Sequence, residues 1–163
     1  MQIKQHLQTN NKTIGINSRK FIIVHHTATW EGSIRGVLNT LTKWNVSCHY
    51  VIDTNGDLYK IWENTDILWH AGVSSWWNIK AMNPVSIWIE VIWPLQNGFT
   101  FEQRKGVKEL CQELMKKYNI PRQSVLRHAD VSPGRKIDID LRFLNDSEGK
   151  PKYKTWKEWQ DSL

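Results

Sequence analysis

Two runs of apolar residues predict buried strands. Residues 21–24 read Phe-Ile-Ile-Val, a pattern typical of a strand covered on both faces, and they lead directly into His25 and His26. Residues 87–92 form a second apolar run, interrupted by one acid, Glu90. A buried carboxylate needs a partner, so both predicted strands carry side chains that are suited to chemistry.

A hairpin and a third strand follow from shorter patterns. Residues 47–53 and 58–62 are strand-like and flank residues 54–57, whose Asn-Gly pair is a strong hairpin signal because both residues tolerate positive φ. Residues 124–126 predict a short strand that delivers His128. We expect the hairpin to be antiparallel.

Helical spacing of apolar residues predicts three helices. The first ends near Trp44, and we expect it to serve only in packing. Its apolar positions are Ile34, Val37, Leu38 and Leu41. The second begins with a capping box at residues 100–103 and stops at Pro121. A terminal helix would dock through Trp156 and Trp159.

These elements predict an α/β fold, with a central mixed β-sheet flanked by α-helices. Residues 1–20 are polar and give no predictable element. The chain of 163 residues has the size of one domain and shows no repeat or linker. We therefore expect residues 1–163 to form a single domain, and a monomer.

Composition limits the classes of binding partner that we expect. Lys and Arg outnumber Asp and Glu by 22 to 16, and the net charge of +6 favours anionic partners such as nucleic acid or an acidic wall polymer. No RNP motif, finger spacing or basic block is present, so we expect no nucleic-acid partner. Cys48 and Cys111 form neither a disulfide framework nor a thiolate zinc motif.

Hydropathy bears on localisation. The first residues lack the apolar core of a signal peptide, and no run approaches the ~20 apolar residues of a membrane span. We therefore expect a soluble protein that is cytoplasmic at synthesis and has no membrane span.

Candidate chemistry is concentrated in residues 127–138. His128 and Asp138 are both possible metal ligands, Lys136 adds a positive charge, and residues 132–134 supply a Ser-Pro-Gly turn. A catalytic zinc takes three protein ligands and one water, so this segment would supply half of a site. The same residue types are common in solvated loops, and the segment alone leaves both interpretations open.

His25 and His26 end a predicted strand, where side chains alternate between faces. Only one of them can easily face a given site, and a satisfied pair of core histidines is the alternative interpretation.

Five motifs occur in a characteristic order. They are Ile23–Ala28, His49–Asp53 with Asn55-Gly56, Trp69–Gly72, Ser86–Glu90 and His128–Asp138. In these motifs the chain resembles the zinc-dependent N-acetylmuramoyl-L-alanine amidases, which include phage endolysins, cytosolic muropeptide amidases and peptidoglycan recognition proteins. The resemblance spans roughly residues 21–138.

The resemblance implies one zinc ion, Zn²⁺, held by His25, His128 and Asp138, with water in the open position. It implies that Glu90 accepts a proton and that Lys136 stabilises the oxyanion. These roles agree with the chemistry of metal-assisted amide hydrolysis.

The resemblance also implies a substrate cleft. His70, Thr27 and Trp69 would contact peptidoglycan or a muropeptide. His26 and His49 would orient their neighbours.

The chain departs from the family pattern at two places. Many members have a catalytic tyrosine where this chain has Cys48, so Glu90 must serve, which favours the glutamate-bearing branch. Members commonly have proline where Ile139 follows Asp138, and its loss predicts a less rigid loop at that ligand.

The favoured function is a peptidoglycan amidase, in particular a bacteriolytic phage or prophage endolysin. A cytosolic amidase that recycles muropeptides is the alternative within the class. A non-catalytic peptidoglycan-binding module is the alternative outside it, but binding modules of the family typically lose a metal ligand, and all three are present here.

Trp77, Trp88 and Trp93 stand where related amidases usually have glycine. The codon UGA is read as glycine in some bacterial lineages and as tryptophan in others. One hypothesis is that these are glycines translated under the wrong code, and ordinary divergence is the alternative. By strand alternation Trp88 shares a face with Glu90, where the family keeps space for zinc, water and substrate.

Overall fold

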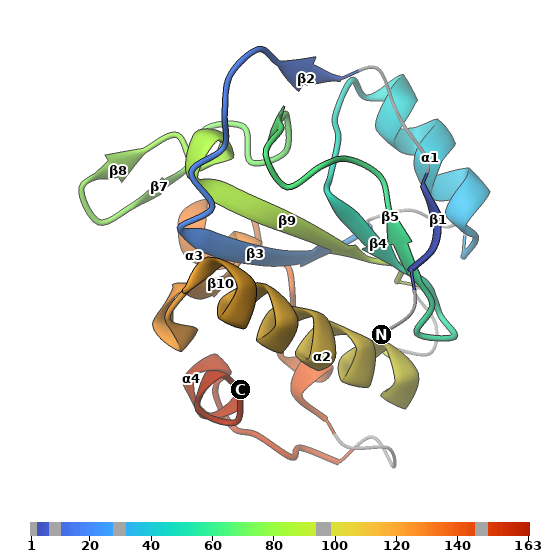
Figure 1. The fold of residues 1–163 in the computed structure, drawn as a ribbon. Helices are drawn as coiled ribbons and strands as arrows, with labels where there is room; N and C mark the ends of the chain where they lie inside the picture. The colour runs from blue at the N-terminus through green and yellow to red at the C-terminus, as the bar shows by residue number, and fades with distance from the viewer. Residues whose placement is uncertain (1–2, 7–10, 28–31, 94–98, 146–149) are drawn as a thin grey trace.

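A mixed sheet with helices on both faces organises the chain (Figure 1). The computed structural model describes residues 3–6, 11–27, 32–93, 99–145 and 150–163, so Ala28 of the first motif lies outside the described residues. In sheet order the strands are β1 (Ile3–His6), β5 (Leu58–Lys60), β4 (Tyr50–Ile52), β9 (Ser86–Val91), β3 (Phe21–His26) and β10 (Val125–Arg127). The predicted fold class is confirmed.

Parallel pairing aligns the strands that carry chemistry. Strands β4, β9, β3 and β10 are successive parallel neighbours, whereas β4 and β5 form the predicted antiparallel hairpin. The carboxyl ends of parallel strands meet at one edge of a sheet. His25 of β3 is paired in register with Glu90 of β9, so these two side chains start as neighbours.

Three helices lie where the sequence predicts them, and one further short helix and three short turns are additional. They are α1 (Ile34–Lys43), α2 (Phe101–Tyr118), α3 (His128–Val131), α4 (Trp156–Asp161) and the 3₁₀ turns η1 (Asn83–Val85), η2 (Arg122–Ser124) and η3 (Leu141–Leu144). The capping box of α2 is present, because Thr100 accepts from the Gln103 backbone and Gln103 accepts from that of Thr100. No described helix is long and apolar enough to span a bilayer.

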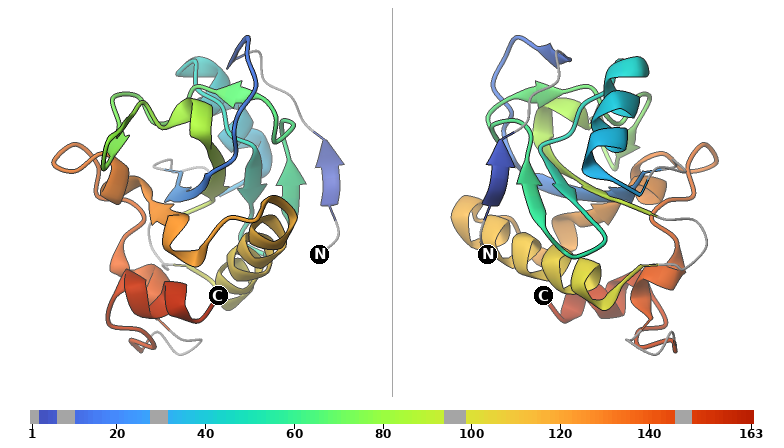
Figure 2. Two further views of the ribbon diagram at one scale, coloured as in Figure 1. Left: turned by 60° about the vertical axis from the view of Figure 1, so that its left-hand side comes forward. Right: turned by 90° about the vertical axis from the view of Figure 1, so that its right-hand side faces the viewer.

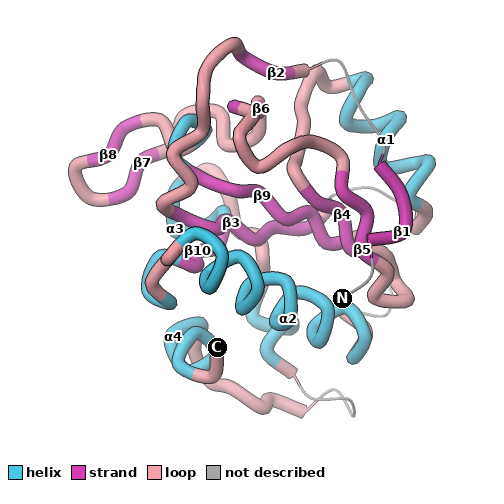
Figure 3. Tube along the Cα trace, in the orientation of Figure 1, coloured by secondary structure: helices cyan, strands magenta, loops and turns pink. Residues whose placement is uncertain are grey.

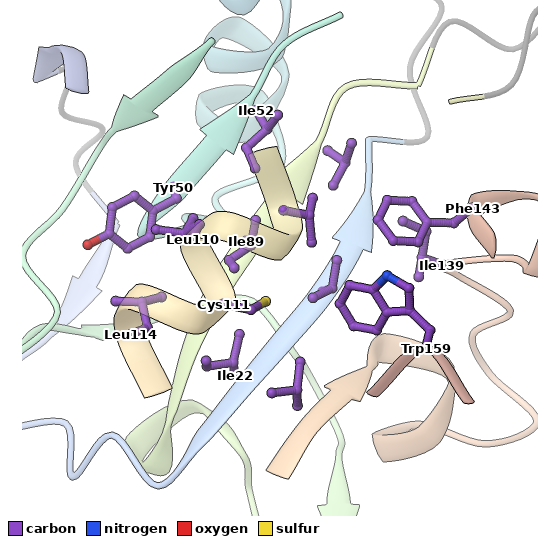
Figure 4. Packing of buried hydrophobic residues seen from close by; sticks show 14 of the residues in the cluster. Ile22, Tyr50, Ile52, Ile89, Leu110, Cys111, Leu114, Ile139, Phe143 and Trp159 are labelled. Carbon is purple, nitrogen blue, oxygen red and sulfur yellow. The ribbon is translucent and has the colours of Figure 1, made fainter. Parts of the chain in front are cut away.

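Helices lie on both faces of the sheet (Figure 2), and a cluster of buried hydrophobic residues lies on each face. Ile22 and Val24 face the layer that contains α2 and α4, whereas Phe21 and Ile23 face the layer that contains α1. Figure 4 shows the first layer, in which Cys111 of α2 is a core residue. Strand alternation therefore places His25 on the α1 side of the sheet.

The terminal helix α4 is attached to strand β10. Trp156 and Trp159 are buried against the core, as predicted. Trp156 Nε1 donates to the carbonyl oxygen of Val125 at 2.9 Å, and Gln160 Nε2 donates to the same oxygen at 2.6 Å. The C-terminal segment thus holds the strand that leads into His128.

The N-terminal segment differs from expectation. Residues 1–20 were expected to give no element, yet they contain β1 at the sheet edge and β2 (Lys12–Thr13), which pairs with β6 (Ile67–Leu68). Polar edge strands gain their order from main-chain pairing with a neighbour, which a sequence pattern does not reveal. A further small hairpin joins β7 (Ser75–Trp76) to β8 (Ile79–Lys80) and projects beside the sheet (Figure 3).

Candidate active site

Four buried titratable side chains meet at the carboxyl edge of the sheet. His25 ends β3, Glu90 lies near the end of β9, and His128 follows β10 at the start of α3. Asp138 comes from the loop after α3 and completes the group. All four residues are no more than 8% exposed, so their charges interact with little screening by water.

Three of these residues form a set of donors that fits zinc. Asp138 Oδ2 lies 3.1 Å from His128 Nδ1 and 3.6 Å from His25 Nδ1. Tetrahedral zinc with bonds of about 2.0–2.1 Å places its ligand atoms about 3.3 Å apart. Two imidazoles and one carboxylate are also a common donor set for catalytic zinc.

The backbone fixes Asp138 although the following residue is not proline. The Ala129 N–H donates to the Asp138 carbonyl oxygen at 2.5 Å, and Ile139 is fully buried in the core. The expectation of a loosely held loop at this ligand therefore finds no support in these contacts.

The other nitrogen of His25 faces a second group. His25 Nε2 lies 2.5 Å from Glu90 Oε2 and 2.9 Å from His70 Nε2, and Glu90 Oε2 lies 3.3 Å from His70 Nε2. These three residues form a second possible donor set for a metal. A contact between a carboxylate and the outer nitrogen of a histidine is also what orients metal-ligating histidines in proteins.

Electrostatics set the protonation states that a metal requires. Burial lowers the pKa of His128, and the nearby Lys136 acts in the same direction. Burial alone would raise the pKa of Asp138, but the hydrogen bond from His128 and the charge of His25 lower it to about 2. At neutral pH the site thus holds a neutral imidazole and an ionised carboxylate, the forms that bind zinc.

Glu90 is ionised as well. Burial alone would raise the pKa of this carboxyl group, but His25 and His70 hold it below its usual range. Burial lowers the pKa of His70 to about 3, so this imidazole is neutral at pH 7.

A cavity of about 430 Å³ opens onto these groups. Its lining residues are His25, His26, Thr27, Val37, Thr40, Leu41, Trp44, Val46, His70, Glu90, His128, Lys136 and Asp138. Helix α1 forms one wall, a role that its sequence does not reveal because its apolar spacing indicates packing alone. The available signal was Trp44, a large aromatic side chain at the polar end of that helix, which is 70% exposed.

A family model described as N-acetylmuramoyl-L-alanine amidase matches residues 10–140. The chain belongs to this family. AmiD of Escherichia coli, an N-acetylmuramoyl-L-alanine amidase, is 30% identical over 135 residues, which cover 73% of this chain and 48% of AmiD. AmpD of Haemophilus influenzae, a 1,6-anhydro-N-acetylmuramyl-L-alanine amidase, is 36% identical over 99 residues, which cover 60% of this chain and 54% of AmpD.

A solved structure of Escherichia coli AmiD extends the similarity to three dimensions. It is a complex with the substrate anhydro-N-acetylmuramic acid-L-Ala-D-gamma-Glu-L-Lys. The match has a TM-score of 0.65 and 27% identity, and it covers 80% of this chain and 56% of that one. The chain spans about half the length of the two curated amidases.

The residues that the amidase resemblance assigned to the cleft divide into two groups. His70, Thr27 and the half-buried Lys136 line the cavity. Trp69 is not among the lining residues, and its Nε1 donates to Thr13 Oγ1. A contact between Trp69 and substrate stays a prediction, and this geometry does not favour it.

The remaining histidines, His26 and His49, pack against the elements around the site. The His26 ring packs against Trp93 and Phe99, as alternation along β3 requires. His49 is fully buried, its Nδ1 accepts the Trp88 N–H at 3.0 Å, and its Nε2 lies 3.2 Å from the Asp66 carbonyl oxygen. His49 therefore connects β9 to the loop before β6.

Trp88 lies beneath the site rather than in the cavity. Its indole is fully buried and stacks on the His70 ring at 4.6 Å between centroids. The rings of His25 and His128 meet it edge-on at 5.7 Å and 5.6 Å. The indole does share the face of Glu90, as alternation predicts, but it forms a floor below the rings.

We expect His49 to make folding sensitive to pH. Burial lowers its pKa from 6.5 to about 4. Because the unfolded chain takes up this proton first, stability is lost as pH falls from about 6.5 to about 4, by on the order of 3 kcal/mol. Urea unfolding with chelator present should show a flatter pH dependence for His49→Asn across this interval. Parallel curves for the parent and the variant would contradict the assignment.

Proposed function

We propose that this chain hydrolyses the amide bond between the lactyl group of N-acetylmuramic acid and L-alanine in peptidoglycan or its fragments. The observation that carries the proposal is the convergence of His25, His128 and Asp138 on one cavity with Glu90 and Lys136. Family membership supports the same chemistry.

The three donors would hold one zinc ion. When bound, zinc supplies a Lewis acid that polarises the amide carbonyl and lowers the pKa of a water in its open position. The contact between His25 Nε2 and Glu90 leaves Nδ1 of the same ring for the metal. We therefore assign the metal to the set that contains Asp138, and the Glu90 side to proton transfer.

Glu90 would move the proton. Its ionised carboxylate lines the cavity and can accept a proton from the attacking water. That proton then passes to the departing amine of L-alanine as the C–N bond breaks, and the lactyl group leaves as a carboxylic acid. Cys48 is fully buried and does not line the cavity, so it offers no substitute.

Lys136 would offset the charge that develops on the carbonyl oxygen. It lines the same cavity, and its positive charge already acts on His128. A fixed cation in a partly buried site stabilises an oxyanion more than it would in water.

The substrate class is peptidoglycan or a soluble muropeptide. The solved AmiD complex holds an anhydromuropeptide, which supports a fragment of that kind. The two curated relatives are named for muropeptide or muramoyl amidase activity, whereas the endolysin role stays a prediction. A non-catalytic binding module is disfavoured because all three donors are present.

We expect zinc and activity to be lost together in His128→Ala and Asp138→Ala. The site has only three protein ligands, so the loss of either residue leaves too few ligands to hold the ion. Elemental analysis of purified variants measures the bound metal. Asp161→Ala removes an exposed carboxylate of α4 and serves as the control that keeps zinc. Active enzyme without metal would exclude this proposal.

We expect Glu90→Gln to retain zinc and to lose about 10²-fold or more in turnover. The amide can still accept a hydrogen bond from His25, but it cannot take a proton. Turnover and zinc content of the same preparation separate the two effects. Cys48→Ala is the control and should keep the rate of the parent. A fast Glu90→Gln enzyme, or an inactive Cys48→Ala enzyme with zinc retained, would show that the assignment is wrong.

We expect Lys136→Met to lower turnover by about 10²-fold with zinc retained, because the oxyanion loses its charge partner while the side chain keeps its aliphatic stem. Lys43→Met removes an exposed positive charge at the end of α1 and controls for net charge. Equal losses in both variants would indicate general attraction of an anionic substrate instead.

Digestion of purified sacculi tests the reaction itself. New N-terminal L-alanine amines are expected, and Asp138→Ala protein should produce none. New reducing sugar ends would refute the amidase assignment. A parallel assay on soluble anhydromuropeptide separates the roles: preference for sacculi supports an endolysin, and preference for the fragment supports recycling.

A further inference from the structure

We propose that positions 77, 88 and 93 are built for glycine, and that the natural gene carries UGA, read as glycine, at each of them. Three separate observations at these positions carry the inference. They concern backbone conformation and hydrogen bonding, and they do not depend on the proposed amidase activity.

Trp77 has a backbone conformation that suits glycine. It is the first of two loop residues between Trp76 and Ile79, which pair across the β7–β8 hairpin (Figure 3). Its φ is +52°, and positive φ at the first position of a two-residue hairpin loop is typically supplied by glycine. The side chain is 84% exposed, so no packing compensates for the strained backbone.

Trp88 has a buried indole N–H without a partner. Its side chain is fully buried among the rings of His25, His70 and His128, and its Nε1 has no acceptor within the described structure. Buried indole N–H groups usually find an acceptor, because an unpaired donor loses its hydrogen bond to water. Glycine would remove this donor from the centre of the site.

Trp93 also has a buried indole N–H without a partner. Its ring packs against His26 and Phe99 with Arg142 over one face, yet its buried Nε1 has no partner among the described residues. By contrast, Trp69 and Trp156 donate their indole N–H groups to Thr13 and to the Val125 carbonyl. The unpaired indoles are thus at two of the three positions where the amidase motifs have glycine.

Glycine at position 88 would change the floor of the site. The indole stacks under His70 and touches the edges of His25 and His128. Two of these three rings belong to the donor set with Asp138. The donor atoms have zinc-like separations with the indole in place, so zinc binding does not depend on it, and we expect the glycine protein to bind zinc at least as tightly.

The codons of the natural gene provide the first test. We expect UGA at positions 77, 88 and 93, and UGG at Trp69 and Trp156, whose indoles have acceptors. Mass spectrometry of protein from the natural source should find glycine at the three positions. UGG at these three codons would overturn the proposal.

Variants of the tryptophan-containing protein, made in a host that does not read UGA as glycine, provide the second test. A protein with Trp77→Gly, Trp88→Gly and Trp93→Gly should keep the Tm of its parent, and with zinc alone as the probe it should bind the ion at least as tightly as its parent does. Trp156→Gly is the matched control for removing a buried indole, and it should lower Tm by about 10 °C.

The outcomes are distinguishable from failure of the proposed function. A triple variant that loses stability as the Trp156→Gly control does, or that binds zinc more weakly than its parent, would overturn the glycine assignment. If neither protein binds zinc, the metal assignment falls, while the codons and the Tm comparison still decide this inference.

Discussion

The site depends on the parallel pairing of β3 with β9. That pairing sets His25 opposite Glu90 at the carboxyl edge of the sheet, and β10, the neighbour of β3 on its other side, leads into His128. A slip of one residue would turn every side chain of a strand to the other face, so the apolar residues that fix the register also fix the site. The hydrophobic layers and the chemistry are therefore specified together.

The two ring nitrogens of the buried His25 side chain face different groups. His25 Nδ1 faces Asp138 and His128, whereas Nε2 faces Glu90 and His70. The buried carboxylates stay ionised because histidines neighbour them, and burial keeps His70 and His128 neutral. A water-poor pocket thus holds two carboxylates and the cation of Lys136 at defined positions, which is the condition for electrostatic catalysis.

The sequence predicted the parts that local patterns encode. The apolar run before His25, the hairpin at Asn55 and the capping box at Thr100 all lie where predicted, because each follows from nearby residues. The convergence of His25, His128 and Asp138 was available only through the family resemblance, since it depends on strand order. The wall at Trp44 and the edge strand β1 arise from tertiary contacts that no local pattern records.

The attachment of α4 to Val125 has a consequence for allosteric linkage. The carbonyl of Val125 accepts hydrogen bonds from both Trp156 and Gln160, and β10 continues directly into His128. The docking of α4 and the position of His128 therefore both depend on strand β10. By thermodynamic reciprocity, any coupling through this strand would act in both directions: an ion at the sheet edge would slow amide exchange in the terminal helix to the same degree that an intact helix would favour the ion.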